Sequence, residues 1–353
     1  MSFQISDLTG FGWNSFFTSQ LDGDDFDRSV PVRVTAVHRG ALHVMGPGVE
    51  TTIPPFRDDP DDEASAATVG DWLLVDGETH RPLRLLERNS LFKRRAAGTG
   101  RAVQLIAANV DTLFIVTSCN QDFNIARLER YLALAHEARV TPVIVLTKID
   151  LCDDPSDYVH QAYDIKSVQM VEALNALDPF EVKRLVPWCD RGQTVALLGS
   201  SGVGKSTLIN TLTGGAAIAT QGIREDDAKG RHTTTGRALH PMPSGGWLID
   251  TPGMRELQLT DAQAGLDEVF SDIVDLARSC RFSDCRHERE PGCAVTAAVR
   301  AGRLEADRLD RWRKLVVEDA LNSESLAERR HRDRAFGKMV KNALRDKKHF
   351  GEG

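Results

Sequence analysis

The sequence predicts a multidomain α/β protein: a small N-terminal β-barrel, a central domain with a parallel sheet and flanking helices, and a helical C-terminal domain. The chain of 353 residues exceeds what one hydrophobic core usually organises. Short β-rich pieces separated by Gly, Pro and Asp turns come first, and strands then alternate with helical stretches, as in α/β domains. Beyond Gly265 the apolar spacing becomes helical.

The composition predicts a cytoplasmic protein without a membrane span. Hydrophobic residues make up 41% of the chain and no apolar run reaches the length of a transmembrane helix, so neither a span nor a secretory signal peptide is expected. The net charge of −7 disfavours attraction of nucleic acid to the whole surface, so such binding needs a local basic face. Residues 329–348 supply one, with nine Lys and Arg against two Asp.

The N-terminal part divides into an arm and a small β domain. Residues 1–30 are rich in Gly, Asp and Phe without periodicity, which predicts a flexible arm. Residues 31–90 contain β-rich pieces that fit any five-stranded β domain and, in the sharper interpretation, an OB-fold; they lie at 32–38, 41–45, 72–76 and 83–87. A linker containing Lys93, Arg94, Arg95 and Arg101 then leads into the central domain, residues 91–265.

Four apolar runs predict buried parallel strands in the central domain, at residues 110–116, 142–146, 194–198 and 247–249. Between the first two, residues 125–139 show near-helical apolar spacing, as expected of a crossover helix. Each of the last three strands runs directly into a polar motif. Because the carboxyl ends of parallel strands meet at one edge of a sheet, these motifs are expected to form one site.

The strongest motif fits G-x-x-x-x-G-K-[ST] and consists of Gly199, Ser200, Ser201, Gly202, Val203, Gly204, Lys205 and Ser206, followed by Thr207. It sits between a strand and an apolar helix, the context that this phosphate-binding loop requires. Backbone amides are expected to surround the phosphates, Lys205 to reach the β/γ oxygens and Ser206 to ligate Mg²⁺. The alternative is a Gly-rich turn that binds nothing.

Two further elements complete a γ-phosphate and magnesium site. Asp250-Thr251-Pro252-Gly253 follows a strand and matches D-x-x-G, in which Asp250 holds Mg²⁺ through water and the Gly253 amide meets the γ-phosphate. Between it and the phosphate loop, residues 230–235 read Gly-Arg-His-Thr-Thr-Thr in a stretch suited to a nucleotide-ordered switch loop. One of these threonines is expected to complete the Mg²⁺ shell.

A guanine-recognition loop is predicted upstream, at Thr147-Lys148-Ile149-Asp150, which matches N-K-x-D with Thr in place of Asn. The Asp150 carboxylate can accept hydrogens from guanine N1 and N2, and the Lys148 stem can pack on the base. Asn175-Ala176 is the candidate for a second base-contacting element, with Asn in place of Ser. These elements normally follow the phosphate loop, so the order is circularly permuted and D-x-x-G leads directly into the C-terminal domain.

That C-terminal domain, residues 266–353, contains a Cys₃His motif, Cys280-x4-Cys285-x-His287-x5-Cys293. Four soft ligands at this spacing suit a closed tetrahedral site for one structural Zn²⁺ rather than a catalytic zinc with an open position. Cys119, Cys152 and Cys189 are scattered and are expected to be structural.

Together these motifs resemble the RsgA (YjeQ) family of circularly permuted GTPases that depend on the small ribosomal subunit. The resemblance covers residues 30–350 and implies an OB-fold, a permuted GTPase domain and a zinc domain. It implies binding of GTP and GDP, the 30S subunit and 16S rRNA as partners, and a monomer. It also implies a role in late 30S maturation and GTP hydrolysis stimulated by the ribosome. By resemblance, Thr234 is the magnesium-binding threonine of the switch loop.

No motif assigns the catalytic residue, because the residue after Gly253 is Met254, whose thioether cannot orient water as the Gln of Ras does. His232 is our candidate, since it adjoins the magnesium-binding threonine and an imidazole can orient water near neutral pH. The alternative is that His232 contacts rRNA or packs the loop.

Other functions stay open on the sequence alone. Another rRNA- or tRNA-directed permuted GTPase shares the nucleotide motifs but lacks the zinc cluster together with the barrel. A P-loop ATPase or a small-molecule kinase needs neither the basic tail nor Asp150. A nucleotide-gated RNA-binding module binds GTP with little turnover.

Overall fold

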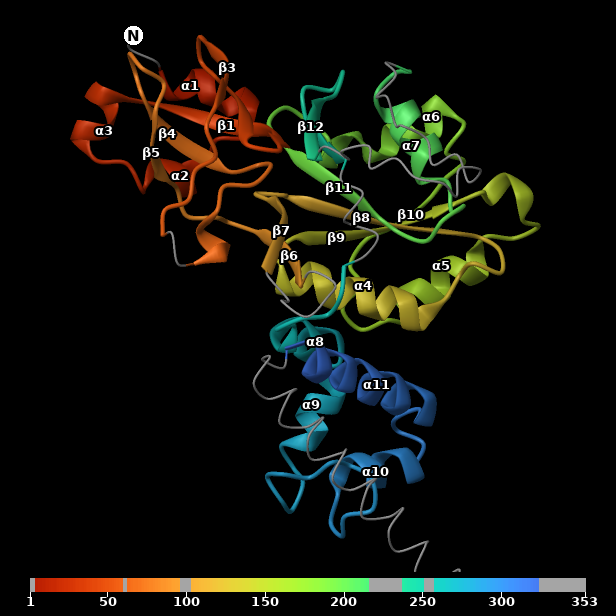
Figure 1. Ribbon diagram of the computed structural model, residues 1–353. Helices are drawn as coiled ribbons and strands as arrows, with labels where there is room; N and C mark the ends of the chain where they lie inside the picture. Colours follow the sequence, from red (N-terminus) through yellow and green to blue (C-terminus); the bar gives the residue numbers. More distant parts are fainter. Residues whose placement is uncertain (1–3, 60–61, 96–102, 216–236, 251–256, 324–353) are drawn as a thin grey trace, which may run out of the picture.

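The computed structural model describes residues 4–59, 62–95, 103–215, 237–250 and 257–323, which form three units in sequence along the chain (Figure 1). The first unit is a partly open β-barrel whose strands lie in the order β3-β2-β1-β4-β5. The strands are β1 (Ser29–His38), β2 (Ala41–Gly46), β3 (Val49–Ile53), β4 (Trp72–Asp76) and β5 (Pro82–Leu85). Alternate apolar side chains of these strands fill the interior, as the OB-fold prediction requires.

The N-terminal segment is folded, so the prediction of a flexible arm is wrong for residues 4–28. They form a 3-10 turn (Thr9–Phe11) and three short helices: α1 (Ile5–Leu8), α2 (Ser15–Thr18) and α3 (Gly23–Arg28). Trp13 and Phe17 are 4% and 2% exposed and pack with Trp72, whose ring lies edge-on to Trp13 with centroids 4.8 Å apart. Aromatic burial on the outer face of the barrel therefore orders this segment.

The second unit contains a mixed sheet in the order β10-β9-β8-β11-β13-β12. Five of its strands are parallel, and β12 pairs antiparallel with β13. The strands are β8 (Thr112–Ser118), β9 (Thr141–Thr147), β10 (Val171–Ala173), β11 (Thr194–Leu198), β12 (Arg237–Pro241) and β13 (Trp247–Asp250). The four predicted apolar strands are thus confirmed as β8, β9, β11 and β13, and β8, β9 and β11 are buried on both faces.

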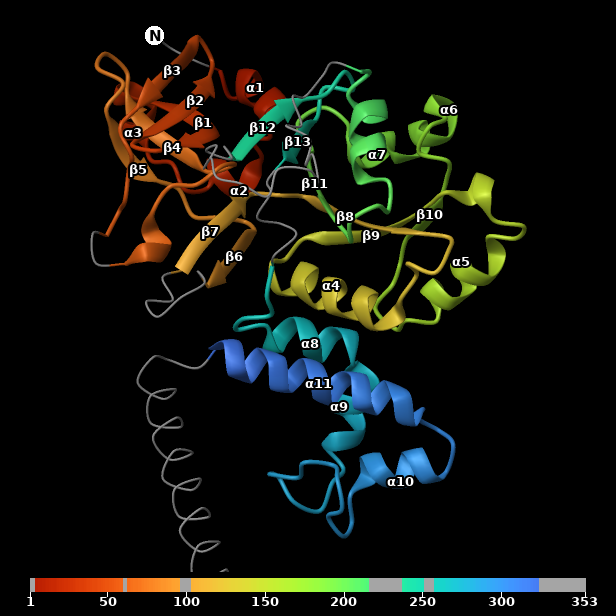
Figure 2. The same ribbon diagram turned by 45° about the vertical axis from the view of Figure 1, so that its right-hand side comes forward.

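Helices cover both faces of this sheet (Figures 1 and 2). One face carries α4 (Ile125–Glu137), the predicted crossover helix, and α5 (Ser156–Tyr163). The other face carries α6 (Pro179–Val182), a 3-10 helix (Lys183–Trp188) and α7 (Lys205–Leu212). Apolar side chains of the sheet therefore divide into two clusters, one packed under α4 and one packed under α7.

The predicted linker after Arg88 is instead a β-hairpin, which corrects the sequence interpretation. Its strands are β6 (Leu91–Arg95) and β7 (Val103–Ala108), paired antiparallel from Leu91 opposite Ala108 to Arg95 opposite Val103. The charged side chains of Lys93 and Arg94 hid this strand, because the usual apolar alternation is interrupted there.

The barrel is joined to the central sheet by strand pairing and by one buried arginine. β1 pairs with β12 at Ala36 and Val37, which makes the barrel continuous with the sheet. Arg33 is 1% exposed and donates hydrogen bonds to the Asn109 carbonyl (3.2 Å) and to the Thr194 hydroxyl (2.8 Å) of the central domain. A buried guanidinium is stable only when its donors are paired, so Arg33 holds the two units in one arrangement.

The third unit lies beneath α4 and is helical (Figures 1 and 2). It comprises α8 (Gln263–Val269), α9 (Ser271–Ala277), α10 (Ala294–Arg300) and α11 (Ala306–Ser323). Its core is continuous with that of the central domain, because side chains of α8 pack directly on α4. No helix in the described part of the chain is both long and apolar enough to cross a bilayer.

Candidate nucleotide site and metal centre

Three of the predicted motifs meet at the carboxyl edge of the central sheet. The phosphate loop follows β11, the Thr147–Asp150 motif begins at the end of β9, and Asn175-Ala176 lies just beyond β10. The parallel registers align these ends, since Ser118 at the end of β8 faces Thr147 and Ala173 faces Leu146. The sheet thus brings together loops that are separated along the chain, as the sequence predicted.

The phosphate loop has the backbone that its glycines predict. Gly202 and Gly204 have φ angles of 77° and 92°, in the left-handed region that side chains disfavour. Gly199 is required for another reason, because a Cβ there would lie 2.2 Å from the Val116 carbonyl oxygen. With Ser200 and Ser201 at the turn and α7 starting at Lys205, the loop can present successive amides to an anion.

Lys205 is 7% exposed, and its ammonium donates to the Gly199 carbonyl oxygen (2.8 Å) and to the Ser200 carbonyl oxygen. The charge is therefore held inside the loop, where bound phosphate oxygens can take over its hydrogen bonds. Ser206 is exposed and Thr207 half-buried in the first turn of α7. The exposed Ser206 is the residue that would ligate a magnesium ion at this loop.

Thr147 links the base loop to the phosphate loop, a role that the motif had left open. Its side chain is fully buried, and its hydroxyl donates a 2.6 Å hydrogen bond to the carbonyl oxygen of Val203. The same hydroxyl lies 3.2 Å from the Thr117 carbonyl oxygen at the end of β8. The threonine that replaces Asn therefore still ties the two nucleotide loops together across β8.

The remaining residues of the predicted base loops lie in tight turns at the same edge of the sheet. Lys148 has a φ angle of 60° and turns the chain so that the exposed Asp150 falls in a short 3-10 helix (Ile149–Leu151). Asn175 closes a tight turn, because its side-chain oxygen accepts from the Leu177 amide at 2.9 Å. Such a turn needs only a short oxygen-bearing side chain, which explains how Asn substitutes for Ser.

A second tie joins the base side of the site to the helix that follows the phosphate loop. The hydroxyl of Thr211, on α7, donates to the carbonyl oxygen of Ala176 at 2.8 Å. The sequence contained no signal for this contact, which depends on α7 lying beside the end of β10. Both base loops are therefore attached to the phosphate-loop region through hydroxyl groups.

The remaining predicted residues of this site are not all described. The backbone of Asp250 ends β13 beside β11, as the D-x-x-G prediction requires. Gly253, Thr234 and His232 lie outside the described residues. The predicted switch loop and its catalytic candidate thus remain expectations from the sequence.

The four predicted metal ligands come together, with their ligand atoms within 4.8 Å of one another. The Cys280 and Cys293 sulfurs are 3.9 Å apart, and each lies 3.5 Å from Nδ1 of His287. A tetrahedral zinc ion with the usual bond lengths requires S···S edges of about 3.8 Å and S···N edges of about 3.6 Å. The cluster, completed by Cys285, therefore has the size and chemistry of a closed zinc site.

Surrounding groups favour a thiolate at Cys293, whereas burial and the neighbouring thiols of Cys293 and Cys280 raise the pKa of Cys285 to about 11. The Ala294 amide donates to the Cys280 sulfur at 3.3 Å and the Thr296 amide to the Cys293 sulfur at 3.4 Å. Burial opposes a charge at Cys293, but hydrogen bonds from Thr296, His287 and Cys285 lower the pKa of its thiol to about 6. The His287 ring also packs on Trp312 of α11, with ring centroids 5.6 Å apart.

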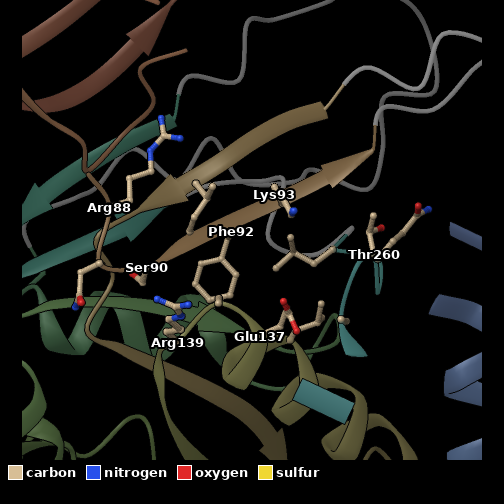
Figure 3. Close-up of a pocket in the computed structure, with 14 residues that line it drawn as sticks. Arg88, Ser90, Phe92, Lys93, Glu137, Arg139 and Thr260 are labelled. Carbon is tan, nitrogen blue, oxygen red and sulfur yellow. The ribbon is translucent and has the colours of Figure 1, made fainter. Parts of the chain in front are cut away.

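A cavity of about 270 Å³ lies away from these two sites, between the start of β6, the end of α4 and residues 257–262 (Figure 3). Its lining includes Phe92, Lys93, Glu137, Arg139 and Thr260. Sequence analysis had not indicated any feature here. The cavity borders the segment through which D-x-x-G continues into the C-terminal helices.

Comparison with known proteins agrees with this arrangement. The model of the RsgA GTPase family matches residues 85–260. A curated relative from Vibrio parahaemolyticus, small ribosomal subunit biogenesis GTPase RsgA 2, is 50% identical over 97% of this chain and 94% of its own. The RsgA of Mesorhizobium japonicum is 51% identical over 90% of this chain and 91% of its own.

Solved structures with the same fold include YjeQ from Thermotoga maritima, with a TM-score of 0.59, 24% identity and coverage of 82% of this chain and 98% of that one. The circularly permuted GTPase YloQ gives a TM-score of 0.57 at 25% identity, covering 84% of this chain and 97% of its own. Both the extended sequence identity and the permuted order of strands around the phosphate loop lead to one conclusion: the chain is a circularly permuted GTPase of the RsgA family.

Proposed function

We propose that this GTPase binds the small ribosomal subunit and assists its late maturation, hydrolysing GTP to GDP and phosphate with stimulation by the subunit. The observation that carries the proposal is that one chain joins permuted nucleotide loops, a barrel and a Cys₃His cluster. This chain is 50% identical to a relative named for small-subunit biogenesis. The alternative of a nucleotide-gated module with little turnover predicts no stimulation.

In this proposal the nucleotide is held from two sides. Residues 199–207 surround the phosphates, with Lys205 on the β/γ oxygens and Ser206 on Mg²⁺. Asp250 and Thr234 complete the magnesium shell, Gly253 meets the γ-phosphate, and His232 orients the attacking water. Lys148 and Asp150 select guanine, and Asn175-Ala176 shapes the far side of the base site. The Thr147–Val203 and Thr211–Ala176 hydrogen bonds support this assignment, because they keep both halves in register.

The Cys₃His cluster binds one structural Zn²⁺ in this proposal. Its ligand set offers no open coordination position, and its spacing matches a tetrahedral ion. Zinc supplies local folding energy to a loop that has little core of its own. It also fixes the chain between α9 and α10 against α11, through the contact of His287 with Trp312.

The proposed partner surface includes the barrel and the basic tail. We assign the barrel to residues 31–90, the GTPase domain to 91–265 and the zinc domain with its tail to 266–353, acting as a cytoplasmic monomer. Residues 329–348 carry the positive charge that rRNA phosphates attract. Phosphate contacts of this kind make binding to 16S rRNA dependent on salt, whereas the nucleotide site makes it dependent on the γ-phosphate.

Hydrolysis with and without purified 30S subunits tests the proposal. We expect the single-turnover rate of GTP hydrolysis to rise at least about tenfold with saturating 30S and to stay unchanged with 50S. Lys205→Ala is the matched control, because it removes the phosphate-contacting charge and should abolish hydrolysis in both conditions. A rate that stays low with bound 30S would assign the chain to the nucleotide-gated binding modules instead.

A further inference from the structure

Residues 257–262 connect the nucleotide site to the C-terminal helices. They follow directly after residues 251–256, which include Gly253 of the D-x-x-G motif, and they lead into α8. Whatever fixes this segment therefore fixes the chain immediately after the D-x-x-G motif.

The last turns of α11 hold the segment through three hydrogen bonds. The Asp319 carboxylate accepts from the Ala262 amide at 2.9 Å, and the Asn322 amide group donates to the Leu259 carbonyl oxygen at 2.9 Å. The Ser323 hydroxyl accepts from the Asp261 amide at 2.7 Å. Asp319 is 8% exposed, so its bond to the buried backbone is shielded from competing water.

A fourth contact involves α4 of the GTPase domain. Arg130 donates to the Leu257 carbonyl oxygen at 3.1 Å, and its guanidinium pairs with Glu318 of α11 at 2.7 Å. Glu318 thus orients the arginine that holds the first residue of the segment. The end of α11 and the middle of α4 act on the same short stretch of backbone.

The start of α11 is fixed to α4 by a buried charge network. Glu129 of α4 is fully buried and accepts from Arg308 at 2.9 Å and from Arg311 at 2.7 Å. Arg308 also pairs with Asp272 of α9 at 2.8 Å. Glu129 and Arg308 each have two charged partners in this network, so α11 is expected to remain attached to α4 as one body.

The opposite side of the segment borders the cavity of Figure 3. Leu257, Gln258, Thr260 and Ala262 contribute to its lining, and the volume is about 270 Å³. On its other side, the buried side chains of Leu257, Leu259 and Ala262 anchor the segment in the hydrophobic core. The hydrogen bonds from α11 and Arg130 then fix the path of its backbone.

We propose that Asp319, Asn322 and the Arg130–Glu318 pair are positioning residues for GTP hydrolysis. They fix the backbone that follows the D-x-x-G motif and so position this motif for contact with the γ-phosphate. They also connect this backbone to α11, which precedes the basic tail in the chain. The regulatory part of this inference rests on the proposed function, in which the tail engages the small subunit. The positioning of the D-x-x-G motif affects GTP hydrolysis whether or not the small subunit is bound.

The test compares Asp319→Ala with Asp319→Asn in the full-length, zinc-loaded protein. The alanine variant loses the acceptor for the Ala262 amide, whereas the asparagine variant keeps an oxygen at the same place. We expect Asp319→Ala to lower kcat at least about fivefold, with and without 30S subunits, and to leave the Kd of a non-hydrolysable GTP analogue within about twofold. Asp319→Asn should restore most of kcat. Asp307→Ala, in the exposed first turn of α11, is the matched control.

A purely structural role predicts a different result. Asp319→Ala would then unfold at a lower temperature but hydrolyse GTP at the wild-type rate, which would overturn the proposal. If that variant does not fold, Glu318→Gln decides the question, because it removes only the partly exposed ion pair with Arg130 and should lower kcat in the same direction. Absence of 30S stimulation in the wild-type protein contradicts the proposed function, whereas an unchanged kcat in the variants contradicts the positioning role.

Discussion

Replacing Thr147 by valine tests whether one hydroxyl group couples the guanine loop to the phosphate loop. Valine has nearly the same shape as threonine, so the buried site stays filled and only the hydroxyl is lost, with its hydrogen bond to the Val203 carbonyl oxygen and its weaker contact with the Thr117 carbonyl oxygen. The neighbouring Gly204 lies against the same side chain, since a Cβ at Gly204 would come within 3.3 Å of the Thr147 hydroxyl. The change therefore acts at the point where the phosphate loop turns.

The magnitude follows from the burial of both partners. A net hydrogen bond contributes about 0.5–1.5 kcal/mol, and a buried carbonyl left unsatisfied costs about 1–3 kcal/mol. A carbonyl oxygen has two lone pairs, which places the expected loss at about 1–2 kcal/mol. If the free phosphate loop relaxes in the variant because this bond is missing, binding of nucleotide must return the loop to its original conformation at a cost in free energy. The affinity for both GTP and GDP should then fall about 5- to 30-fold.

Fluorescent GDP titration and a denaturant unfolding curve, measured on the same protein, distinguish the two outcomes. Selectivity for guanine over xanthine nucleotides should not change, because Asp150 is untouched. Thr147→Ser, which keeps the hydroxyl, should bind nucleotide within about threefold of wild type. If Thr147→Val loses the full 1–2 kcal/mol of unfolding free energy but binds GDP as wild type does, the contact only stabilises the fold and the coupling argument is refuted.

Four more predictions concern the other assigned groups. Asp150→Asn should weaken GTP and favour xanthosine nucleotides in competition binding; unchanged GTP affinity would show that residues 147–150 are not the base loop. Elemental analysis should find one zinc per chain, and Cys280→Ser should unfold the C-terminal domain while sparing nucleotide binding; less than about half an equivalent counts against the site. His232→Ala should reduce single-turnover hydrolysis on 30S about 100-fold with analogue binding intact, and a near-wild-type rate removes it from catalysis. Deleting residues 329–353 should weaken 30S binding and flatten its salt dependence, whereas an unaltered slope indicates a merely solvated tail.

Short-range patterns were sufficient wherever the chemistry depends on neighbouring residues. The phosphate loop needs glycine where φ is positive and where Gly199 approaches a carbonyl, so those residues mark it in any protein. The Cys₃His cluster is equally local, because its four ligands lie within one loop and the start of α10. Apolar runs identified β8, β9, β11 and β13 because these strands lie in the interior of a parallel sheet.

Long-range packing decided the features that the sequence interpretation misjudged. The N-terminal helices have only four to six residues, too few to show a helical period, and they are ordered because Trp13 and Phe17 meet Trp72. The strand β6 carries charged residues in its second half, so only its pairing with β7 reveals it. No local sequence pattern distinguishes such short helices from an unstructured arm.

The sequence by itself determined the fold class and the circular permutation, and it predicted the nucleotide loops and metal ligands, because each depends on residue types at fixed local spacing. Only the tertiary structure decided how these parts are connected. Thr147 reaches Val203 across β8, and Asp319 reaches the Ala262 amide from the far end of α11. Such contacts join residues that are distant along the chain, and each needs only a hydroxyl or a carboxylate. These groups are too common in a sequence to identify their partners, which are known only when the folded chain brings the two atoms within hydrogen-bonding distance.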